Sequence, residues 1–282
     1  MKYFESFAGV GGFSLAMANR SECVGMSEID KYASSVLRNN YPHIINYGDI
    51  TKIRWSDISN FDLLVGGSPC QDFSVAGKRK GISGERSGLF YEYLRALEEK
   101  MPSTFIWENV KGVMSSNGGW DFARIITAFS EAGYSLWWQV LNAKDFGVPQ
   151  NRERVFVIGT RNRSPREILF EPEAGRKSLI EITQNAPDAE RVYDPEGIGR
   201  TLKGLGGGEG AKTMLIKIDD RVRRLTCVEA ERLMGWPDNW TKFGLNEKGD
   251  KIELSDNQRY KMCGNGVVSN VVKELLNLHF MI

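Results

Sequence analysis

The sequence predicts an α/β protein with a doubly wound, mostly parallel sheet and a smaller, irregular second region. Three observations lead to this prediction. Short apolar segments alternate with amphipathic helical segments over residues 1–160, a glycine-rich turn joins the first two of them, and the alternation then stops. The chain has 282 residues, which suits one large domain or a large domain with a small one.

Each predicted strand is a short apolar run between turn-forming residues, and each predicted helix repeats its apolar residues every three or four positions. The strands are expected at Tyr3–Phe7, Glu22–Ser27, Asp62–Val65, Thr104–Trp107, Leu136–Leu141 and Arg154–Gly159. The helices are expected at Phe13–Asn19, Lys31–Asn40, Leu89–Met101 and Phe122–Ala132. Ligands of such sheets bind beyond the carboxyl ends of the strands, so the loops after these strands are the expected place for a site.

Beyond the sixth predicted strand the sequence loses this regularity. Residues 164–224 contain no convincing helical pattern, and Gly204–Gly210 consists mostly of glycine. Thr226–Met234 is predicted to be a helix that begins with a capping box, because Glu229 follows Thr226 by three residues. This segment is expected to be a scaffold.

The end of the chain becomes regular again. Val267–Leu278 has the pattern of a helix that packs back on the sheet. We therefore predict a larger domain made of residues 1–165 and 258–282, and a smaller domain made of residues 166–257.

Composition excludes several classes of protein. The 37 Lys and Arg residues balance 36 Asp and Glu residues to a formal charge of +1, so nucleic acid would be bound through local patches only. The two histidines and the four scattered cysteines argue against a metal site, a His-based triad and a disulfide framework. No apolar run approaches the roughly 18 residues of a membrane span, and the N-terminus does not have the pattern of a signal peptide. The sequence therefore predicts a soluble, cytoplasmic protein with no metal and no membrane contact.

Phe7–Phe13 follows the first predicted strand and opens the first helix. Its glycines let the backbone approach a ligand closely and leave helix N–H groups directed at it. Glu28 ends the second predicted strand, where a carboxylate can bind the two hydroxyls of a ribose. Asp49 and Ile50 add an acceptor and an apolar flank that would suit an adenine. These features are typical of a binding site for any adenosine cofactor, such as NAD or S-adenosylmethionine. A tight turn alone would also account for the glycines.

A cysteine in an unusual setting follows the strand Asp62–Val65. A free cysteine is most often buried and inert, and this interpretation suits Cys23 and Cys227, which lie in apolar or helical patterns. Cys70 instead lies in a loop among Gly, Ser, Pro, Gln and Asp. A thiol in such a loop is a candidate nucleophile, provided that its thiolate is stabilised locally or its proton is transferred.

A series of short sequence blocks extends along almost the whole chain. The blocks are Phe7–Phe13, Glu28, Asp49-Ile50, Pro69–Gln71, Ser87–Phe90, Glu108–Val110, Gln150–Arg154, Arg224–Pro237 and Gln258–Val268. In this order they resemble those of DNA cytosine-5 methyltransferases of the bacterial and phage type. One Gly-x-Gly is weak evidence, whereas Pro-Cys-Gln, Glu-Asn-Val and Gln-x-Arg-x-Arg are specific in combination.

The resemblance implies a catalytic set made of Cys70, Glu108, Arg152 and Arg154, and the chemistry of cytosine agrees with it. Cytosine C5 becomes nucleophilic only after a nucleophile adds at C6, and Cys70 would be this nucleophile. Charge then develops on N3 and O2, where Glu108 would serve N3 and Arg154 would hold O2. Arg152 would point the same way as Arg154 in an extended chain and would support the site or the loop.

The resemblance also implies a Rossmann-like methyltransferase sheet that binds S-adenosyl-L-methionine. The candidate cofactor residues come from the blocks just named and are Phe7, Gly9, Gly11, Gly12, Glu28, Ile29, Asp49, Ile50, Pro69, Leu89, Asn265 and Val267. Gly266 stands where many relatives have Ser or Ala, so this part of the prediction rests on its two neighbours.

Double-stranded DNA is the implied substrate, and the target cytosine must be flipped out of the duplex. A basic, glycine-hinged loop after Cys70 would close on phosphates, and residues 166–257 would form a target-recognition domain. The candidate DNA contacts are the basic and polar residues Lys78, Arg79, Lys80, Arg86, Arg200, Thr201, Lys203 and Lys212. An ordinary solvated loop is the alternative for either segment.

Other functions stay open at this point. A tRNA cytosine-5 methyltransferase shares the blocks, but that branch usually has Pro where this chain has Ser68, and a Cys-Phe-Thr signature that this chain lacks. A dehydrogenase would leave Cys70, Glu108 and Arg154 without a role, and their presence argues against a catalytically silent DNA-binding relative. We also expect the protein to be a monomer. A cognate restriction endonuclease would be its partner at the genetic level only.

Overall fold

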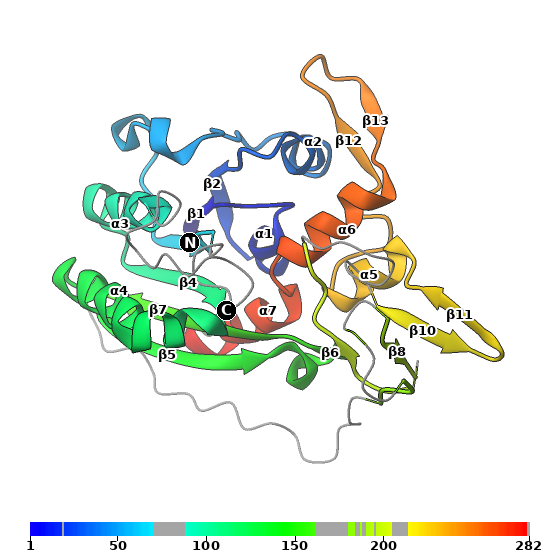
Figure 1. Cartoon of the computed structure of the whole chain (residues 1–282). Helices are drawn as coiled ribbons and strands as arrows, with labels where there is room; N and C mark the ends of the chain where they lie inside the picture. The colour runs from blue at the N-terminus through cyan, green and yellow to red at the C-terminus, as the bar shows by residue number, and fades with distance from the viewer. Residues whose placement is uncertain are drawn as a thin grey trace.

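The computed structural model describes residues 1–18, 20–69, 88–161, 180–183, 187, 190–194, 196–204 and 214–280. Its centre is a six-stranded sheet in the order β2-β1-β3-β4-β7-β5 (Figure 1). The strands are β1 (Lys2–Ser6), β2 (Glu22–Ser27), β3 (Leu63–Gly66), β4 (Thr104–Val110), β5 (Ser135–Asn142) and β7 (Glu153–Thr160). All six predicted strands are confirmed, and the boundaries differ by a few residues at most.

The sheet is mostly parallel, as predicted, with one exception. β2, β1, β3 and β4 pair in parallel, whereas β7 is antiparallel to both of its neighbours, β4 and β5. β7 therefore begins at the edge of the sheet where the parallel strands end. This reversal brings the start of β7 to the edge at which ligands of such sheets bind.

Helices cover both faces of the sheet, so the doubly wound arrangement is confirmed. Side chains alternate along each strand: Ile106 of β4 packs with α1, α2 and α7, whereas Phe105 and Trp107 pack with α3 and α4. The helices are α1 (Gly12–Met17), α2 (Lys31–Asn40), α3 (Gly88–Lys100), α4 (Trp120–Glu131) and α7 (Ser269–Phe280). This part of the chain also has short 3-10 helices at Ile50–Lys52, Trp55–Asp57 and Ala143–Phe146, and a 3-10 segment at Lys111–Gly119 that is interrupted by non-helical backbone at Ser116, Asn117 and Gly118.

The remaining elements are short strands and two helices (Figure 1). They are β6 (Gln150–Asn151), β8 (Val192–Tyr193), β9 (Gly199–Arg200), β10 (Leu215–Ile218), β11 (Arg221–Arg224), α5 (Cys227–Leu233), β12 (Phe243–Leu245), β13 (Lys251–Glu253) and α6 (Asp256–Asn265). The predicted capping box at the start of α5 is confirmed, because the backbone N–H of Glu229 donates to Thr226 Oγ1 at 3.2 Å and that of Thr226 donates to Glu229 Oε2 at 2.7 Å. The hairpin β12–β13 and helix α6 are elements that the sequence patterns did not predict.

Part of the predicted smaller domain contacts the sheet domain extensively. The hairpin β12–β13 lies against α2, where Arg38 Nε donates to the carbonyl of Leu245 at 2.9 Å. Tyr193, Leu202 and Trp236 also share a hydrophobic cluster with residues of the central sheet. In the described part of the chain, no helix combines the length and the apolar character that crossing a membrane requires.

Candidate active site

The glycine-rich turn between β1 and α1 has a backbone that side chains would obstruct. Gly9 and Gly11 have φ values of 57° and 80°, in the left-handed region that favours glycine. A Cβ on Gly12 would lie 2.7 Å from Val267 Cγ1, so Gly12 is required by the close approach of the α6–α7 connection. The turn thus brings Val267, one of the predicted cofactor residues, against the first helix.

Glu28 lies beside this turn, as the sequence predicts for a residue at the end of β2. The backbone N–H groups of Gly9 and Asp30 each donate to one of its carboxylate oxygens at 2.7 Å. Burial raises the pKa of Glu28, against the effect of these two hydrogen bonds. The neighbouring Ile29 is 73% exposed, so an apolar side chain stands open next to a fixed carboxylate.

Asp49 and Ile50 form the start of a short 3-10 helix. Asp49 Oδ1 accepts hydrogen bonds from the backbone N–H of Thr51 at 3.0 Å and from its hydroxyl at 2.8 Å. The hydrogen bond from the Thr51 hydroxyl is the main cause that lowers the pKa of Asp49. The side chain of Ile50 is buried, whereas Leu89 at the start of α3 is half-buried.

Glu108 and Arg154 meet at the carboxyl edge of the sheet. Arg154 Nε lies 3.0 Å from Glu108 Oε1, and each side chain is about 15% exposed. The two come together because β7 is antiparallel to β4: Val110, at the end of β4, pairs with Arg154 near the start of β7. Burial raises the pKa of Glu108, and the positive charges of Arg154 and Arg152 oppose that shift.

The chain that leads to Cys70 runs beside Glu108. A Cβ on Gly67 would lie 2.7 Å from Glu108 Oε2, so a larger residue would displace the carboxylate. Ser68 accepts hydrogen bonds from both neighbours of Glu108: the indole N–H of Trp107 donates to Ser68 Oγ at 3.2 Å, and Asn109 Nδ2 donates to the Ser68 carbonyl at 3.3 Å. These contacts hold the segment before the half-buried Pro69.

Arg152 has a different environment from Arg154. It precedes β7, and its buried guanidinium donates to three backbone carbonyls, those of Leu202 at 3.3 Å, Gly264 at 3.0 Å and Gly266 at 2.6 Å. Arg152 therefore joins the segment after β9 to the α6–α7 connection, while Arg154 contacts Glu108. Arg152 and Arg154 were expected to point the same way, but their guanidinium groups bind different partners: backbone carbonyls for Arg152 and the Glu108 carboxylate for Arg154.

The α6–α7 connection reaches the glycine turn from the other side. Ser269 Oγ donates to the carbonyl of Gly12 at 2.8 Å. Asn265 is exposed and Val267 is half-buried against Gly12. The structure therefore brings the predicted residues at both ends of the chain to one turn.

Several predicted residues lie outside the described part of the chain: Cys70, Lys78, Arg79, Lys80, Arg86 and Lys212. Among the predicted DNA contacts that are described, Arg200 is only 8% exposed, Thr201 donates its hydroxyl to the Asn151 carbonyl, and Lys203 is exposed. A buried guanidinium such as that of Arg200 does not present its charge to DNA in this conformation.

The other three cysteines do not have the properties of a nucleophile. Burial raises the pKa of Cys23 to about 12 and that of Cys227 to about 11, and it raises the pKa of the fully buried Cys263 as well. Each of these thiols is therefore protonated near neutral pH. Cys70 is the remaining cysteine of the chain.

Sequence reasoning missed an ion pair that supports Glu28. Lys261 Nζ on α6 lies 2.7 Å from Asp30 Oδ2, and Asp30 in turn caps α2 and donates its backbone N–H to Glu28. The hydrogen bonds from Lys261 and from the first turn of α2 lower the pKa of Asp30, although partial burial acts in the opposite direction. The signal in the sequence was Asp30 as an N-cap residue; nothing there pointed to its partner 231 positions away.

Comparisons with known proteins agree with this geometry. The sequence profile described as C-5 cytosine-specific DNA methylase matches residues 1–196 and 173–280. The chain is 35% identical to the type II methyltransferase M.HhaI of Haemophilus parahaemolyticus, over 97% of this chain and 92% of that protein. It is 31% identical to M.NlaX of Neisseria lactamica, over 97% of this chain and 94% of that protein.

Solved structures show the same fold at lower sequence identity. The methyltransferase EhMeth of Entamoeba histolytica superposes with a TM-score of 0.79 at 18% identity, covering 100% of this chain and 98% of that one. The Dnmt2 methyltransferase of S. pombe gives a TM-score of 0.75 at 19% identity, with coverages of 100% and 98%. With profile matches over most of the chain and relatives above 30% identity along nearly its full length, this chain is a member of the C-5 cytosine-specific DNA methylase family.

Proposed function

We propose that this protein transfers a methyl group to C5 of a cytosine that it flips out of duplex DNA at a specific sequence. The observation that carries the proposal is the Glu108–Arg154 pair at the carboxyl edge of the sheet, next to the segment that leads to Cys70. A carboxyl group with a raised pKa and a guanidinium at one edge match the two places where cytosine gains charge, N3 and O2.

In the proposed reaction the Cys70 thiolate adds to C6, and the electron pair of the C5–C6 bond moves toward N3 and O2. Glu108, whose pKa is raised by burial, gives its proton to N3, and Arg154 holds O2 by charge and hydrogen bonding. C5 is then enamine-like and nucleophilic. After methylation the C5 proton passes to water, and the C5–C6 double bond forms again as the C6–S bond breaks to return Cys70 as a thiolate. The N3 proton then returns to Glu108.

S-Adenosyl-L-methionine fits the residues beside the glycine turn. Glu28 has one N–H donor on each oxygen and retains acceptor capacity for two ribose hydroxyls, while the exposed Ile29 provides apolar surface for a ring. When bound, this cofactor supplies the methyl group that C5 takes up. Asp49 would accept a hydrogen bond from the adenine amino group, and the backbone of the glycine turn would face the amino-acid part.

The cofactor assignment also includes residues from three further places. They are Phe7, Gly9, Gly11 and Gly12 at the glycine turn, Pro69 after β3 with Leu89 at the start of α3, and Asn265 and Val267 where α6 ends and leads to α7. We assign Arg152 as a positioning residue, because its guanidinium binds three backbone carbonyls.

Target recognition is assigned to the predicted smaller domain, residues 166–257, with the basic loop after Cys70 closing on the DNA backbone. Arg152 and the β6–β9 pairing support this assignment, because they connect residues 199–202 to the catalytic edge. The cytoplasmic location, the monomeric state and a restriction endonuclease partner stay predictions.

The test is methyl transfer from labelled S-adenosyl-L-methionine to unmethylated genomic DNA and, in parallel, to bulk tRNA, followed by bisulfite sequencing. We expect label in DNA at one short sequence, and no transfer by the C70A variant although it still binds S-adenosylhomocysteine. Label in tRNA alone would replace DNA by tRNA as the substrate. Clear residual transfer by C70A would overturn the covalent mechanism.

A further inference from the structure

We infer that Arg95, on α3, is a positioning residue that fixes the turn proposed to bind adenine and thereby sets the selectivity for this base. The inference rests on the proposed function, because it concerns the cofactor site. Its basis is the fork of contacts that joins α3 to both ends of the 3-10 helix Ile50–Lys52.

The guanidinium of Arg95 holds this turn through its backbone. Nη2 donates to the carbonyl of Ile50, and Nη1 donates to the carbonyl of Ile53, each at 3.1 Å. Ile50 is the first residue of the 3-10 helix and Ile53 is its C-cap, so one planar group spans the helix from end to end. An isolated 3-10 turn has poor hydrogen-bond geometry of its own, and such external contacts define its shape.

Two carboxylates fix the guanidinium itself. Glu92 Oε2 lies 2.8 Å from Nε and 2.7 Å from Nη2, and Glu99 Oε1 lies 3.0 Å from Nη1. Together with the two carbonyls these make five contacts, which equals the number of N–H donors of a guanidinium. The side chain is 30% exposed and is therefore partly screened, but its planar fork restricts where the two carbonyls can lie.

The turn held in this way carries the residues proposed to contact adenine. Asp49 caps its beginning, and Ile50 buries its side chain in the cluster shared with α3 and the sheet. A shift of the Ile50 and Ile53 carbonyls would therefore move the Asp49 carboxylate. In the proposed site this carboxylate accepts the adenine amino group and disfavours a base with a carbonyl at that position.

The same helix provides a matched control. Lys100 Nζ donates to the carbonyl of Ile58 at 2.7 Å, which is the C-cap of the next 3-10 helix, Trp55–Asp57. This contact also joins α3 to a turn through a carbonyl, but it holds a turn to which no cofactor residue has been assigned. Removing it tests the general effect of loosening α3 from its neighbours.

The experiment compares the full-length wild type with R95M, R95K and K100M. Calorimetry measures the Kd of S-adenosylhomocysteine and of S-inosylhomocysteine, in which a carbonyl replaces the amino group, and thermal unfolding is recorded for each variant. We expect R95M to weaken S-adenosylhomocysteine binding about tenfold and to reduce the preference for adenine over hypoxanthine. R95K should behave like R95M, because lysine keeps the charge but not the fork. K100M should stay within about twofold of the wild type on both ligands.

Two outcomes would overturn the inference. One is an R95M variant with unchanged affinity and unchanged preference between the two ligands. The other is equal weakening of both ligands together with a loss of thermal stability, which would indicate a structural role alone. If the wild type bound neither ligand, the cofactor assignment itself would fail, and this outcome is distinguishable because it does not depend on Arg95.

Discussion

Two pairs of the same chemical type, Glu108–Arg154 and Glu231–Arg259, lie in different regions of this protein. Glu108 and Arg154 are partly exposed at the carboxyl edge of the sheet, where their nitrogen–oxygen distance is 3.0 Å. Glu231 and Arg259 are also 3.0 Å apart, but Glu231 is completely buried and the Arg259 side chain is 8% exposed. The distance alone does not distinguish the two pairs.

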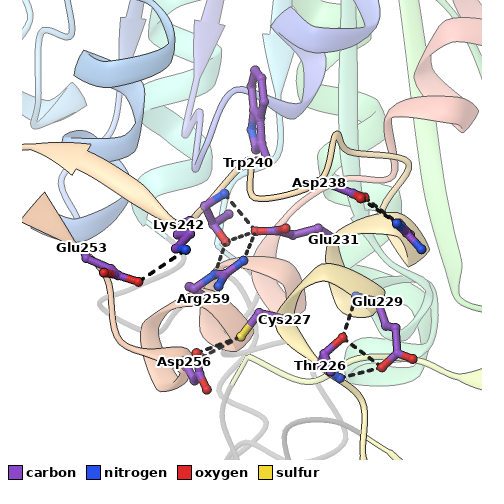
Figure 2. Close-up of polar contacts among 12 residues, drawn as sticks. Thr226, Cys227, Glu229, Glu231, Asp238, Trp240, Lys242, Glu253, Asp256 and Arg259 are labelled. Atoms are coloured by element: carbon purple, nitrogen blue, oxygen red, sulfur yellow. Dashed lines mark hydrogen bonds and ion pairs between the residues drawn. The ribbon is translucent and has the colours of Figure 1, made fainter.

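The surroundings of the pairs do distinguish them. Figure 2 shows Glu231 and Arg259 directed toward one another between α5 and α6. Glu231 Oε1 also accepts from the backbone N–H of Thr241 at 2.9 Å and from its hydroxyl, and Arg259 Nε donates to the same hydroxyl at 3.3 Å. The pair therefore holds three segments together, whereas Glu108 and Arg154 connect two strands and remain accessible from one side. The two pairs thus differ in their neighbours and not in their geometry: a hydrogen-bond network encloses Glu231 and Arg259, whereas Glu108 and Arg154 are the pair that we propose to act on cytosine.

The largest expected effect comes from changing Glu108, because the comparison predicts a loss of chemistry without a loss of fold. E108Q cannot give up a proton to N3, so we expect methyl transfer in a single turnover to slow by about 10³-fold. Affinity for S-adenosylhomocysteine and the thermal unfolding temperature should stay at wild-type values. A matching fall in stability would place Glu108 among the structural pairs.

Changing Arg259 should have the opposite effect, namely a loss of stability. R259M leaves the buried Glu231 without its cation, and we expect a loss of about 4 kcal/mol in the free energy of unfolding, measured with urea. The double variant E231Q/R259M removes both charges, while the glutamine oxygen can still accept from Thr241, and it should recover most of this loss. If R259M were as stable as the wild type, the structural role of the Glu231–Arg259 pair would be contradicted.

Glu5 is a buried carboxylate with no cation among its hydrogen-bond donors, which are the backbone N–H groups of Phe13 and Ser14 and the Ser14 hydroxyl. Burial raises the pKa of Glu5 from 4.5 to about 7, although the hydrogen bonds from Ser14 act to lower it. The folded state therefore holds a proton that the unfolded state releases, so this contribution to stability is complete below about pH 4.5 and disappears as the pH rises to about 7.

The corresponding experiment is urea unfolding of the wild type and of E5Q across this pH range. The wild type should lose up to about 3 kcal/mol relative to E5Q as the pH rises, because glutamine keeps the acceptor but does not titrate. Parallel pH profiles for the two proteins would show that Glu5 has an ordinary pKa.

The smallest expected effect concerns Lys261, whose pair with Asp30 is partly exposed. K261M should raise the Kd of S-adenosylhomocysteine about threefold with the rate of methyl transfer at saturation unchanged, and K261R should restore the affinity. K242M is a matched control, because Lys242 is equally exposed and pairs with Glu253 on the hairpin. An equal effect of both variants would exclude a specific role of Lys261 at Glu28.

The sequence predicted the sheet and its first helices because their apolar residues follow clear periods of two and of three to four. It did not predict the direction of β7, since a buried strand such as Val155–Ile158 has the same pattern in either direction. Helix α6 was missed for a different reason: the residues it buries include Arg259 and Gly264, which do not form an apolar stripe.

The places of the glycine turn, Glu28 and Glu108 at the ends of strands were predictable, because each follows or ends a clear apolar run. The candidate site was not predictable where a side chain acts through the backbone of a distant segment. Arg152 binds the carbonyls of Leu202, Gly264 and Gly266, and carbonyls carry no signal in the sequence. The partners of such residues depend on tertiary structure alone.

The reversed direction of β7 has a consequence for how this architecture can diversify. Because Arg154 stands near the beginning of β7, its position opposite β4 is set before the chain leaves the sheet at Thr160. Insertions or exchanges beyond that point leave the Glu108–Arg154 register untouched. The segment after Thr160 contacts the sheet domain at other places, such as the ladder of Gly199–Arg200 with β6 and the Leu202 carbonyl that binds Arg152. The pair proposed to act on cytosine is thereby set by β4 and β7 alone, independently of the length of the segment that follows.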